Sequence, residues 1–484
     1  MIDNSGLVSV RTVLGHSYPG EEYWFSPSSD FPDLPFAHRA TSDNPVYDAV
    51  RQCMLDNNLD SAHAGSREWN PLSSFTGKGG KVFVLCNFVY ERRPLEKPGW
   101  FEGKCTHASV IRPVIDYALK AVGPEGKVFF GNAPLQSADW SRLMKETGSE
   151  KLLEFYDRHA PGQVKACDLR SFIISQSIIG AEKNKPWKSS IAPVEVDLGD
   201  QSLLSELKGN RHYRIANYNH KDIERYHNGG SNKYLLNRHI LDSDLIISIP
   251  KLKTHCKVGV TLSIKGCVGA IELKQCLAHH QKGSFSCGGD EYEKHGVVGA
   301  LLSAVDDWTY SRESSAIKDA GLIFERLING VNNRLLKQVS FGSWEGNDTC
   351  WRMAVDIARC VTHASKTGEL LDAPQRKHVV FTDGIIGGEG EGPLDPRPVK
   401  SGFLSFASDC YAADYVSCTA MGFNPEKFPI ISSLPGLNRY PLTGLTAKEI
   451  KVSVNGRLES PGAIRNVAGK RFSPPLFWKK GCLA

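Results

Sequence analysis

Cationic side chains gather after a predicted strand that ends at Pro250. Residues 251–265, KLKTHCKVGVTLSIK, contain five basic residues: Lys251, Lys253, His255, Lys257 and Lys265. A lysine ammonium group binds a phosphate or a carboxylate as a point charge, and neighbouring hydroxyl groups add hydrogen-bond donors. We therefore predict that this segment binds a small anionic substrate through Lys251, Thr254 and Thr261. The alternative is a solvated basic edge of the molecule.

The same segment has the residue types that proton transfer requires. A lysine that lies among other cations and is partly desolvated has a lowered pKa, so that it can act as a base or a nucleophile. We therefore expect Lys253, Lys265 or His255 to be catalytic. For His255 the alternative is a structural, hydrogen-bonded histidine.

An acidic, glycine-rich segment follows another predicted strand. Residues 382–393, TDGIIGGEGEGP, place Asp383, Glu389 and Glu391 on a backbone that glycine leaves free to approach a ligand closely. Carboxylate oxygens bind hard divalent cations. The segment is thus a candidate site for a divalent metal, namely Mg, Mn, Zn or Fe. The alternative is a flexible turn whose carboxylates form salt bridges with the lysines.

Histidines and cysteines between residues 255 and 287 raise the question of a metal cluster. Four cysteines occur there, at positions 256, 267, 276 and 287, but none has the C-x₂-C spacing of typical zinc or iron–sulfur sites. No iron–sulfur cluster is expected. Adjacent histidines on a strand point to opposite faces, and of the pair His279 and His280 we choose His280 as a catalytic residue.

Asn347 and Asp348 precede a predicted helix, within the sequence WEGNDTCWR. Both side chains could contact a substrate, and the nearby tryptophans could stack on a ring. Asparagine and aspartate are also preferred N-cap residues, which is the alternative for both.

Apolar runs alternating with helical patterns set the expected fold. Buried strands are predicted at 81–89, 127–134, 244–250 and 377–383, and helices at 106–122 (beginning at a Thr106 cap), 295–311, 348–364 and 408–423. We predict an α/β fold, with a mixed or mostly parallel open sheet covered by helices on both faces. The loops at the ends of three strands, at 129–134, 250–255 and 382–393, would then converge on one crevice. The first of these loops contains Asn132.

Length and composition bound the other properties. The chain has 484 residues, which predicts two or three domains, or one large domain with extensions. Changes in the sequence pattern divide it into an irregular N-terminal extension at 1–78, an α/β core domain at 79–432, and a late strand with a docked C-terminal tail at 433–484. The net charge of +5 is too dilute to indicate nucleic-acid binding. Neither a leader nor an apolar run of membrane-spanning length is found, so a soluble, cytoplasmic protein without a membrane partner is expected. The thirteen cysteines are expected to be reduced.

Several ordered motifs together resemble the family called domain of unknown function 362. They are KVFVLCNFV, TH at 106–107, GNAPLQSADW, IPKLKTH, GVTLSIKG, AHHQKGS, GGDEY, WEGNDT, DGIIGGEGEGPL and SGFLSFASDCYAADYVSCTAMGFNP, within residues 79–432. The resemblance implies an α/β protein and adds Asn87 and His107 to the candidate substrate-binding residues. The family commonly has Lys-Pro-Asn at Leu85 to Asn87, Asp at Asn132, and Lys-Asn at Lys265 and Gly266.

These observations favour an enzyme that acts on a small anionic metabolite, carboxylated or phosphorylated, by acid–base chemistry of lysine and histidine. Proton transfer of the isomerase or lyase type is placed ahead of metal-assisted transfer. The sequence lacks the G-x-S-x-G, P-loop, H-E-x-x-H and G-x-G-x-x-G motifs, so the corresponding enzyme classes lose support. Two alternatives stay open: a redox or metallocentre accessory protein, and a non-catalytic anion-binding module. A homo-oligomer is possible.

Overall fold

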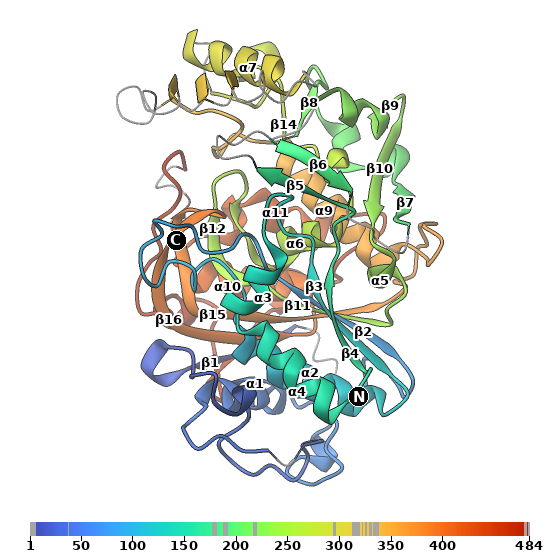
Figure 1. Cartoon of the computed structure of the whole chain (residues 1–484), viewed down its shortest axis with the longest axis vertical. Helices are drawn as coiled ribbons and strands as arrows, with labels where there is room; N and C mark the ends of the chain where they lie inside the picture. The colour runs from blue at the N-terminus through green and yellow to red at the C-terminus, as the bar shows by residue number, and fades with distance from the viewer. Residues whose placement is uncertain are drawn as a thin grey trace.

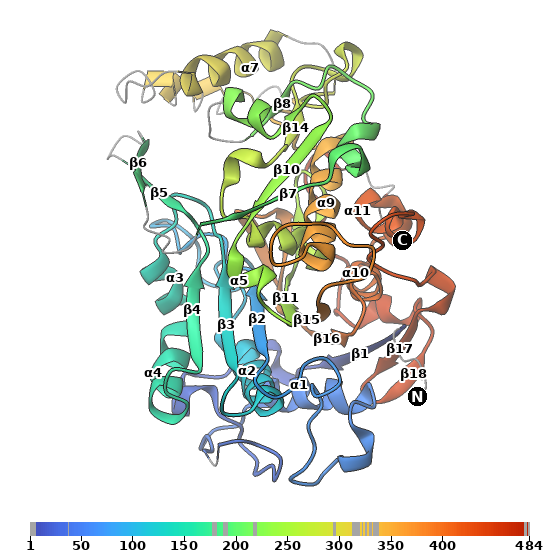
Figure 2. The same cartoon turned by 90° about the vertical axis from the view of Figure 1, so that its right-hand side faces the viewer.

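The computed structural model describes residues 6–36, 38–176, 182–186, 192–215, 220–293, 297–311, 338–478 and 482, together with separate residues between 320 and 332. One large mixed sheet forms its centre (Figures 1 and 2). The strands run in the order β18-β17-β1-β16-β15-β11-β2-β3-β4. Their bounds are β1 Leu7–Thr12, β2 Lys81–Cys86, β3 Lys127–Asn132, β4 Val164–Asp168, β11 Leu245–Ile249, β15 Lys377–Glu391, β16 Asp395–Ala407, β17 Lys451–Val454 and β18 Arg457–Glu459.

Five neighbouring strands, β15, β11, β2, β3 and β4, are parallel, whereas β16 is antiparallel to β15 and to β1. Every residue of β11 is buried. Burial on both faces explains why the parallel strands read as continuous apolar runs in the sequence. The predicted α/β fold with a mixed, mostly parallel sheet is thus confirmed.

Helices cover both faces of this sheet, and the side chains of each strand alternate between two hydrophobic cores. In β2, Val82 and Val84 pack with helices α1 (Pro45–Asp56) and α2 (Ala108–Val122). Phe83 and Leu85 face the other core, which includes α9 (Thr349–His363) and α10 (Cys410–Ala420). Helices α2, α9 and α10 were placed correctly from the sequence, whereas α1 was not predicted.

The cap of α2 corrects the sequence prediction. Thr106 does not cap this helix; the cap is His107, whose side chain accepts a hydrogen bond from the backbone N–H of Ser109. The Thr106 hydroxyl instead donates to the carbonyl of Ile249 at 2.8 Å and accepts from the N–H of Asn87 at 2.9 Å. Thr106 therefore ties the carboxyl end of β2 to that of β11.

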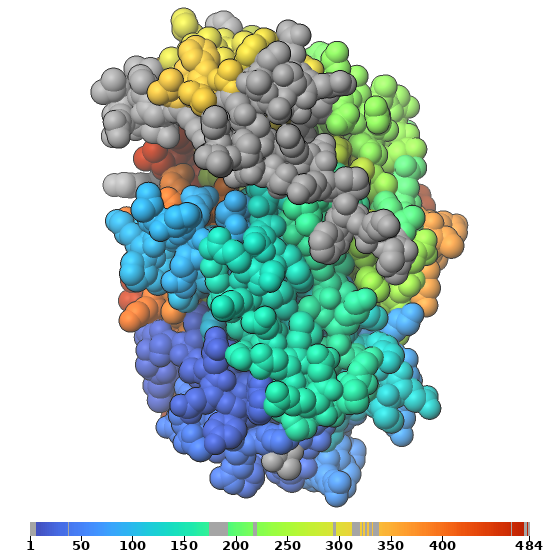
Figure 3. All heavy atoms as spheres, in the orientation of Figure 1, coloured from blue at the N-terminus to red at the C-terminus, as the bar shows by residue number. Residues whose placement is uncertain are grey.

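Residues 1–78 are not irregular throughout, because they contain β1 and α1. Strand β1 is buried between β16 and β17 in the main sheet. Its short length, and the polar residues that separate it from α1, hid it from sequence reasoning. On the face shown in Figure 3, N-terminal residues (dark blue) lie against the surface of α3 (Trp140–Glu146) and α4 (Ser149–His159). The predicted late strand is β17, and Trp478 of the tail stacks on Phe428.

The glycine-rich residues 382–393 form a strand and a hairpin, not a ligand-binding loop. Most of them belong to β15, which pairs with β16 through Glu391. The glycines admit close neighbours: a Cβ on Gly388 would lie 2.5 Å from the carbonyl oxygen of Gly103, and one on Gly392 would lie 1.9 Å from that of Thr254. Glycine here serves close backbone packing.

A smaller layer of structure lies above the carboxyl ends of the parallel strands (Figure 2). It includes β5 Phe172–Gln176, β6 Glu182–Pro186, β7 Val194–Asp197, β8 Tyr213–Arg214, β9 His227–Asn228, β10 Ser231–Leu236, β14 His280–Gln281 and α7 Val297–Tyr310. Helix α5 (Arg238–Leu241) follows β10 and lies beside the main sheet, just before β11 begins. Short strands β12 (Lys251–His255) and β13 (Gly259–Val260) and helix α6 (Leu262–Gly266) connect the smaller layer to the sheet. Within the described residues, no helix has the length and apolar character needed to cross a membrane.

Candidate functional site

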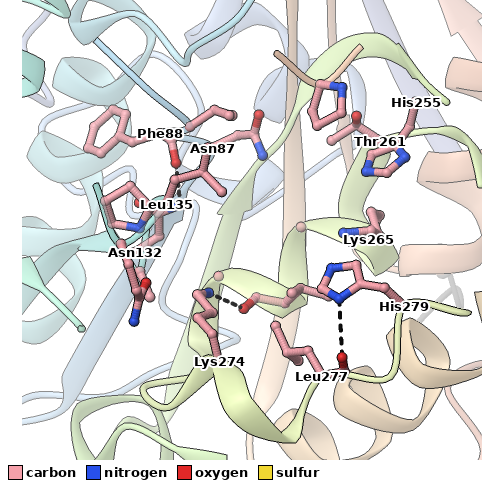
Figure 4. Close-up of a pocket in the computed structure, with 18 of the residues that line it drawn as sticks. Asn87, Phe88, Asn132, Leu135, His255, Thr261, Lys265, Lys274, Leu277 and His279 are labelled. Carbon is pink, nitrogen blue, oxygen red and sulfur yellow. Dashed lines mark hydrogen bonds between the residues drawn. The ribbon is translucent and has the colours of Figure 1, made fainter. Parts of the chain in front are cut away.

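A cavity of about 210 Å³ opens at the carboxyl ends of β2 and β3 and beside β12 (Figure 4). All three strand-end segments predicted to converge contribute to it, through Asn132, His255 and Pro393 respectively. The first two segments therefore converge as predicted, whereas the third reaches the cavity only through Pro393, in the turn between β15 and β16. The polar residues of its lining are Asn87, Asn132, Gln136, Ser137, His255, Thr261, Lys265, Lys274 and His279.

One wall of the cavity is cationic. Lys265 extends from α6, and Lys274 from the 3₁₀ turn Lys274–Cys276; both line the cavity together with His255 and His279. No aspartate or glutamate is among the lining residues of the described chain. The Lys274 ammonium donates to the carbonyl of Val268 at 3.2 Å, whereas Lys265 has no hydrogen-bond partner in the described part of the chain. Such a wall attracts anions.

Burial and mutual repulsion weaken the charges of this wall. Burial, and after it the nearby charge of Lys265, lowers the pKa of Lys274 to about 7. Burial also lowers the pKa of Lys265. Burial and neighbouring lysines hold the pKa of His255 and that of His279 well below the usual value, so both imidazoles are neutral at pH 7. An anion in the cavity would reverse the two lysine shifts, because an opposite charge favours the protonated form.

The two neutral imidazoles carry their protons on different nitrogens. Nδ1 of His255 accepts from the backbone N–H of Lys257 at 3.1 Å, which leaves the proton on Nε2. Nδ1 of His279 lies 3.1 Å from the carbonyl of Leu277 and must donate to it (dashed in Figure 4), so its Nε2 is unprotonated. Hydrogen bonding thus assigns the tautomers. His255 can donate a hydrogen bond from Nε2, and His279 can accept a proton at its own Nε2.

Opposite this wall, amide side chains offer unpaired acceptors. Asn132 is 4% exposed and its Nδ2 donates to the carbonyl of Phe88 at 2.9 Å, which fixes Oδ1 as an acceptor. Oδ1 of Asn132, Oδ1 of Asn87 and both polar atoms of Gln136 are buried without a hydrogen-bond partner in the described part of the chain. Buried polar atoms normally have partners, so the three oxygens suit a ligand that carries hydrogen-bond donors, and Nε2 of Gln136 suits one that carries an acceptor.

Buried carboxylate and amide groups hold the cationic wall in position. Asp414 of α10 accepts hydrogen bonds from the backbone N–H groups of Ser263 at 2.8 Å and Ile264 at 3.1 Å, at the start of the helix that carries Lys265. Asn347 donates through Nδ2 to the carbonyl of His279 at 2.9 Å. Residue Leu262 of α6 has φ of 43°. A bulky residue rarely adopts this conformation, and such strain tends to occur at functional sites.

The pH dependence of stability tests the role of Asp414. Burial raises the pKa of its carboxyl to about 7, against an unfolded value near 4. Between these values the native state binds the extra proton, so wild-type stability falls as pH rises from 4 to 7. We expect the Asp414→Asn variant, which cannot ionise, to gain on the wild type over this range by about 3 to 4 kcal/mol, because the range covers three pH units at ~1.4 kcal/mol per unit. Urea denaturation at pH 4, 5.5 and 7 measures this difference. A constant difference would contradict it.

The structure brings five of the predicted site residues into the cavity: Asn87, Asn132, His255, Thr261 and Lys265. The others lie elsewhere in the described chain, and all but His280, whose two ring nitrogens have no hydrogen-bond partner there, are bound to protein groups. Thr254 donates to the carbonyl of Gly390 at 2.8 Å. Asn347 caps α9 by accepting from the N–H of Thr349 and of Cys350. Asp348 accepts from Trp351 and Arg352.

Lys251 belongs to a buried network outside the cavity lining. Its ammonium forms an ion pair with Asp383 at 3.0 Å and also contacts the Tyr18 hydroxyl. Asp383 accepts from the Tyr18 hydroxyl at 2.7 Å and from the N–H of His107 at 3.1 Å. The His107 ring stacks on Tyr18 at 4.0 Å, and burial lowers the pKa of His107 to about 3. Lys251, His107 and Asp383 thus hold the N-terminal segment to the sheet.

Lys253 is also buried and lies outside the cavity lining. It donates to the carbonyl of Lys104 at 2.6 Å, and burial lowers its pKa to about 7. The pKa agrees with the sequence expectation for a catalytic lysine. Its closed surroundings favour a structural role.

The three carboxylates proposed as metal ligands do not come together. Asp383 and Glu389 are six residues apart on β15, about 20 Å along a strand, and they bind different partners. Glu389 forms an ion pair with Lys470 at 3.1 Å, and Glu391 accepts from the N–H of Leu476 at 2.6 Å. Among the described residues, no group of three His, Cys, Asp or Glu side chains is placed to hold a metal ion. This arrangement gives the divalent-metal hypothesis no support.

Of the two adjacent histidines, the structure places His279 in the cavity, whereas His280 was chosen from the sequence. His279 lines the cavity, whereas His280 is 1% exposed and faces Glu291, with 3.9 Å between Nε2 and the carboxylate. The prediction that the two point apart is correct, but nothing in the sequence shows which of them faces the cavity. Sequence reasoning also missed Lys274 and Gln136. Gln136 lies inside the motif GNAPLQSADW, and that motif was the available signal.

Comparison with known proteins gives a family match over part of the chain but no activity. No curated protein matches the chain. A family model matches one part of the chain, and this part includes β12, α6, His279 and all but the last residue of α10. It leaves out Asn87, Asn132 and Gln136. Residues 200–419 match the model of the family described as Domain of unknown function (DUF362), and the resemblance seen in the sequence is confirmed over this part of the chain.

Proposed function

We propose that the protein is an enzyme that binds a small carboxylated or phosphorylated metabolite in this cavity and moves a proton on it by lysine and histidine chemistry. The cavity lining carries this proposal: two lysines and two neutral histidines face unpaired amide oxygens, without a carboxylate among the lining residues of the described chain. Anion binding, first assigned to Lys251, falls to Lys265 and Lys274.

The tautomers support a division of roles between the imidazoles. His279 is the general base, because its Nε2 is unprotonated, and His255 is the electrophile, because its Nε2–H can donate a hydrogen bond to a substrate oxygen. Both act near neutral pH, where their low pKa values keep them from protonation in the empty cavity. Thr261, which also lines the cavity, supplies a hydroxyl for the substrate.

Hydrogen exchange into substrate tests this proposal directly. The protein is incubated in D₂O with small acids and phosphates, among them pyruvate, lactate, glycerate and dihydroxyacetone phosphate. For at least one compound, we expect the protein to catalyse exchange of a hydrogen on the carbon next to the anionic or carbonyl group. NMR spectroscopy measures the rate of this exchange. The His279→Gln variant, which lacks the base, should exchange it about 100-fold more slowly.

Calorimetry on the same compounds provides the control. His212→Gln is the matched variant, since His212 does not line this cavity. Binding of an anion without exchange would leave only the non-catalytic anion-binding module. Absence of binding by every compound and by inorganic phosphate would contradict the proposed function.

A further inference from the structure

We propose that Lys265 is a nucleophile that forms an imine with the carbonyl group of the substrate, so that the substrate is a small 2-oxo acid or a phosphorylated aldehyde or ketone. This inference rests on the proposed function and deepens it, since it names the reacting group and the substrate class. Its test below separates the two.

Lys265 differs from the other lysines around it in having a free amine. Four neighbours in sequence have their amines committed: Lys251 to Asp383, Lys253 to the carbonyl of Lys104, Lys257 to that of Phe341, and Lys274 to that of Val268. Lys265 lines the cavity and has no such partner in the described part of the chain. It also stands between His255 and His279 in the close-up view (Figure 4).

A lysine becomes nucleophilic when its surroundings disfavour the ammonium form, as in an apolar pocket or beside a second cation. Both conditions hold at Lys265. Val268, Leu277 and Phe88 line the same cavity. The charge of Lys257 helps to lower the pKa of Lys265, and the charge of Lys265 helps to lower that of Lys274. One lysine can therefore stay cationic and bind the anionic group while the other is a neutral amine.

The histidines complete the chemistry of imine formation. The neutral Lys265 amine adds to the carbonyl carbon, and the C–N bond forms as the C=O π bond breaks. The Nε2–H of His255 donates a hydrogen bond to the carbonyl oxygen and keeps its proton, while His279 takes a proton from the nitrogen and passes it to that oxygen. The resulting neutral carbinolamine loses its hydroxyl group as His279 carries the remaining proton from the nitrogen to the leaving oxygen, so that the amine and the carbonyl group give one imine and one water. Once it has taken up a proton from solvent, the imine withdraws electrons from the adjacent carbon, from which His279 can remove a proton.

The opposite wall adds to the definition of the substrate. Lys274 is the cation that binds the carboxylate or phosphate group of the substrate. The buried oxygens of Asn132 and Asn87 have no partner in the described part of the chain and can accept hydrogen bonds from a substrate. This suits hydroxyl groups on the carbons beyond the carbonyl group. A cavity of about 210 Å³ holds a compound of a few carbon atoms.

Reductive trapping tests the inference on the full-length protein. The chain is treated with pyruvate or dihydroxyacetone phosphate and then with sodium borohydride, which reduces an imine to a stable secondary amine. Intact-mass spectrometry should show one adduct per chain, and peptide mapping should place it on Lys265. Lactate and glycerol 3-phosphate, which have no carbonyl group, should give none. The Lys265→Arg variant should lose the adduct, and Lys282→Arg, an exposed lysine outside the cavity, should keep it.

Calorimetry with the same four compounds separates the two proposals. Binding of any of them without an adduct on Lys265 overturns the imine and leaves the anion-binding enzyme intact. An adduct that maps to another lysine also overturns the assignment. Absence of both binding and adduct contradicts both proposals. Because mapping on the wild-type chain decides the site, the result does not depend on folding of the Lys265→Arg variant.

Discussion

Replacing Asp383 with asparagine should lower the free energy of unfolding by about 3 to 5 kcal/mol, because this removes one partner of a buried ion pair and leaves the other charged. Lys251 and Asp383 are both 0% exposed and lie 3.0 Å apart. Asp383 also accepts hydrogen bonds from the Tyr18 hydroxyl and the His107 N–H. Asparagine keeps the size of the side chain but not its charge. Equilibrium denaturation in urea measures the loss.

An exposed ion pair provides the matched control. Asp372 pairs with Arg439, and the two side chains are 81% and 52% exposed. The Asp372→Asn variant should change the free energy of unfolding by less than about 1 kcal/mol. The double variant Lys251→Met, Asp383→Asn should be more stable than Asp383→Asn alone, since it removes the isolated buried charge. If Asp383→Asn kept full stability and lost anion binding instead, the original assignment of Lys251 to the substrate would stand.

The parallel sheet could be predicted from the sequence because it is buried on both faces. The apolar runs that became β2, β3, β11 and the start of β15 had no polar alternation, and that pattern indicates parallel strands under helices. Residues 384–392 could not be predicted in the same way. Their glycines suit both a loop and tightly packed strands, and only tertiary neighbours such as Gly103 and Thr254 distinguish the two.

The cavity was predicted only in part, for a similar reason. Asn132 and His255 were found because they follow apolar strands, and a sheet brings strand ends together. The burial of Lys251 depends on Tyr18 and Asp383, which are 233 and 132 residues away in sequence. Spacing within a segment contains no information about such partners. Lys274 and Gln136 come from irregular segments, where no periodicity shows which way a side chain points.

Binding of inorganic phosphate should weaken as pH rises above about 7, and this is the second large effect that we expect. In the empty cavity the pKa of Lys274 is about 7, against an ordinary value of 10.5. Below pH 7 the ammonium is already present and binds the anion. Above pH 7 the empty protein has lost that proton, so binding must take it up again, and affinity should fall about tenfold per pH unit for one proton. Calorimetry in two buffers with different ionisation enthalpies measures the uptake.

Two substitutions at Lys274 separate charge from other effects on phosphate binding. Lys274→Met removes the charge and should weaken binding at pH 6.5 by 2 to 5 kcal/mol, which is about 30-fold to several-thousand-fold, as for the loss of one partner of a buried charge pair. Lys274→Arg keeps a charge that does not titrate in this range, so the fall in affinity above pH 7 should flatten. An affinity that is independent of pH in the wild type, without proton uptake, would mean that Lys274 does not face the bound anion. The anion would then lie nearer to Lys265, and the imine-forming amine would have to be reassigned.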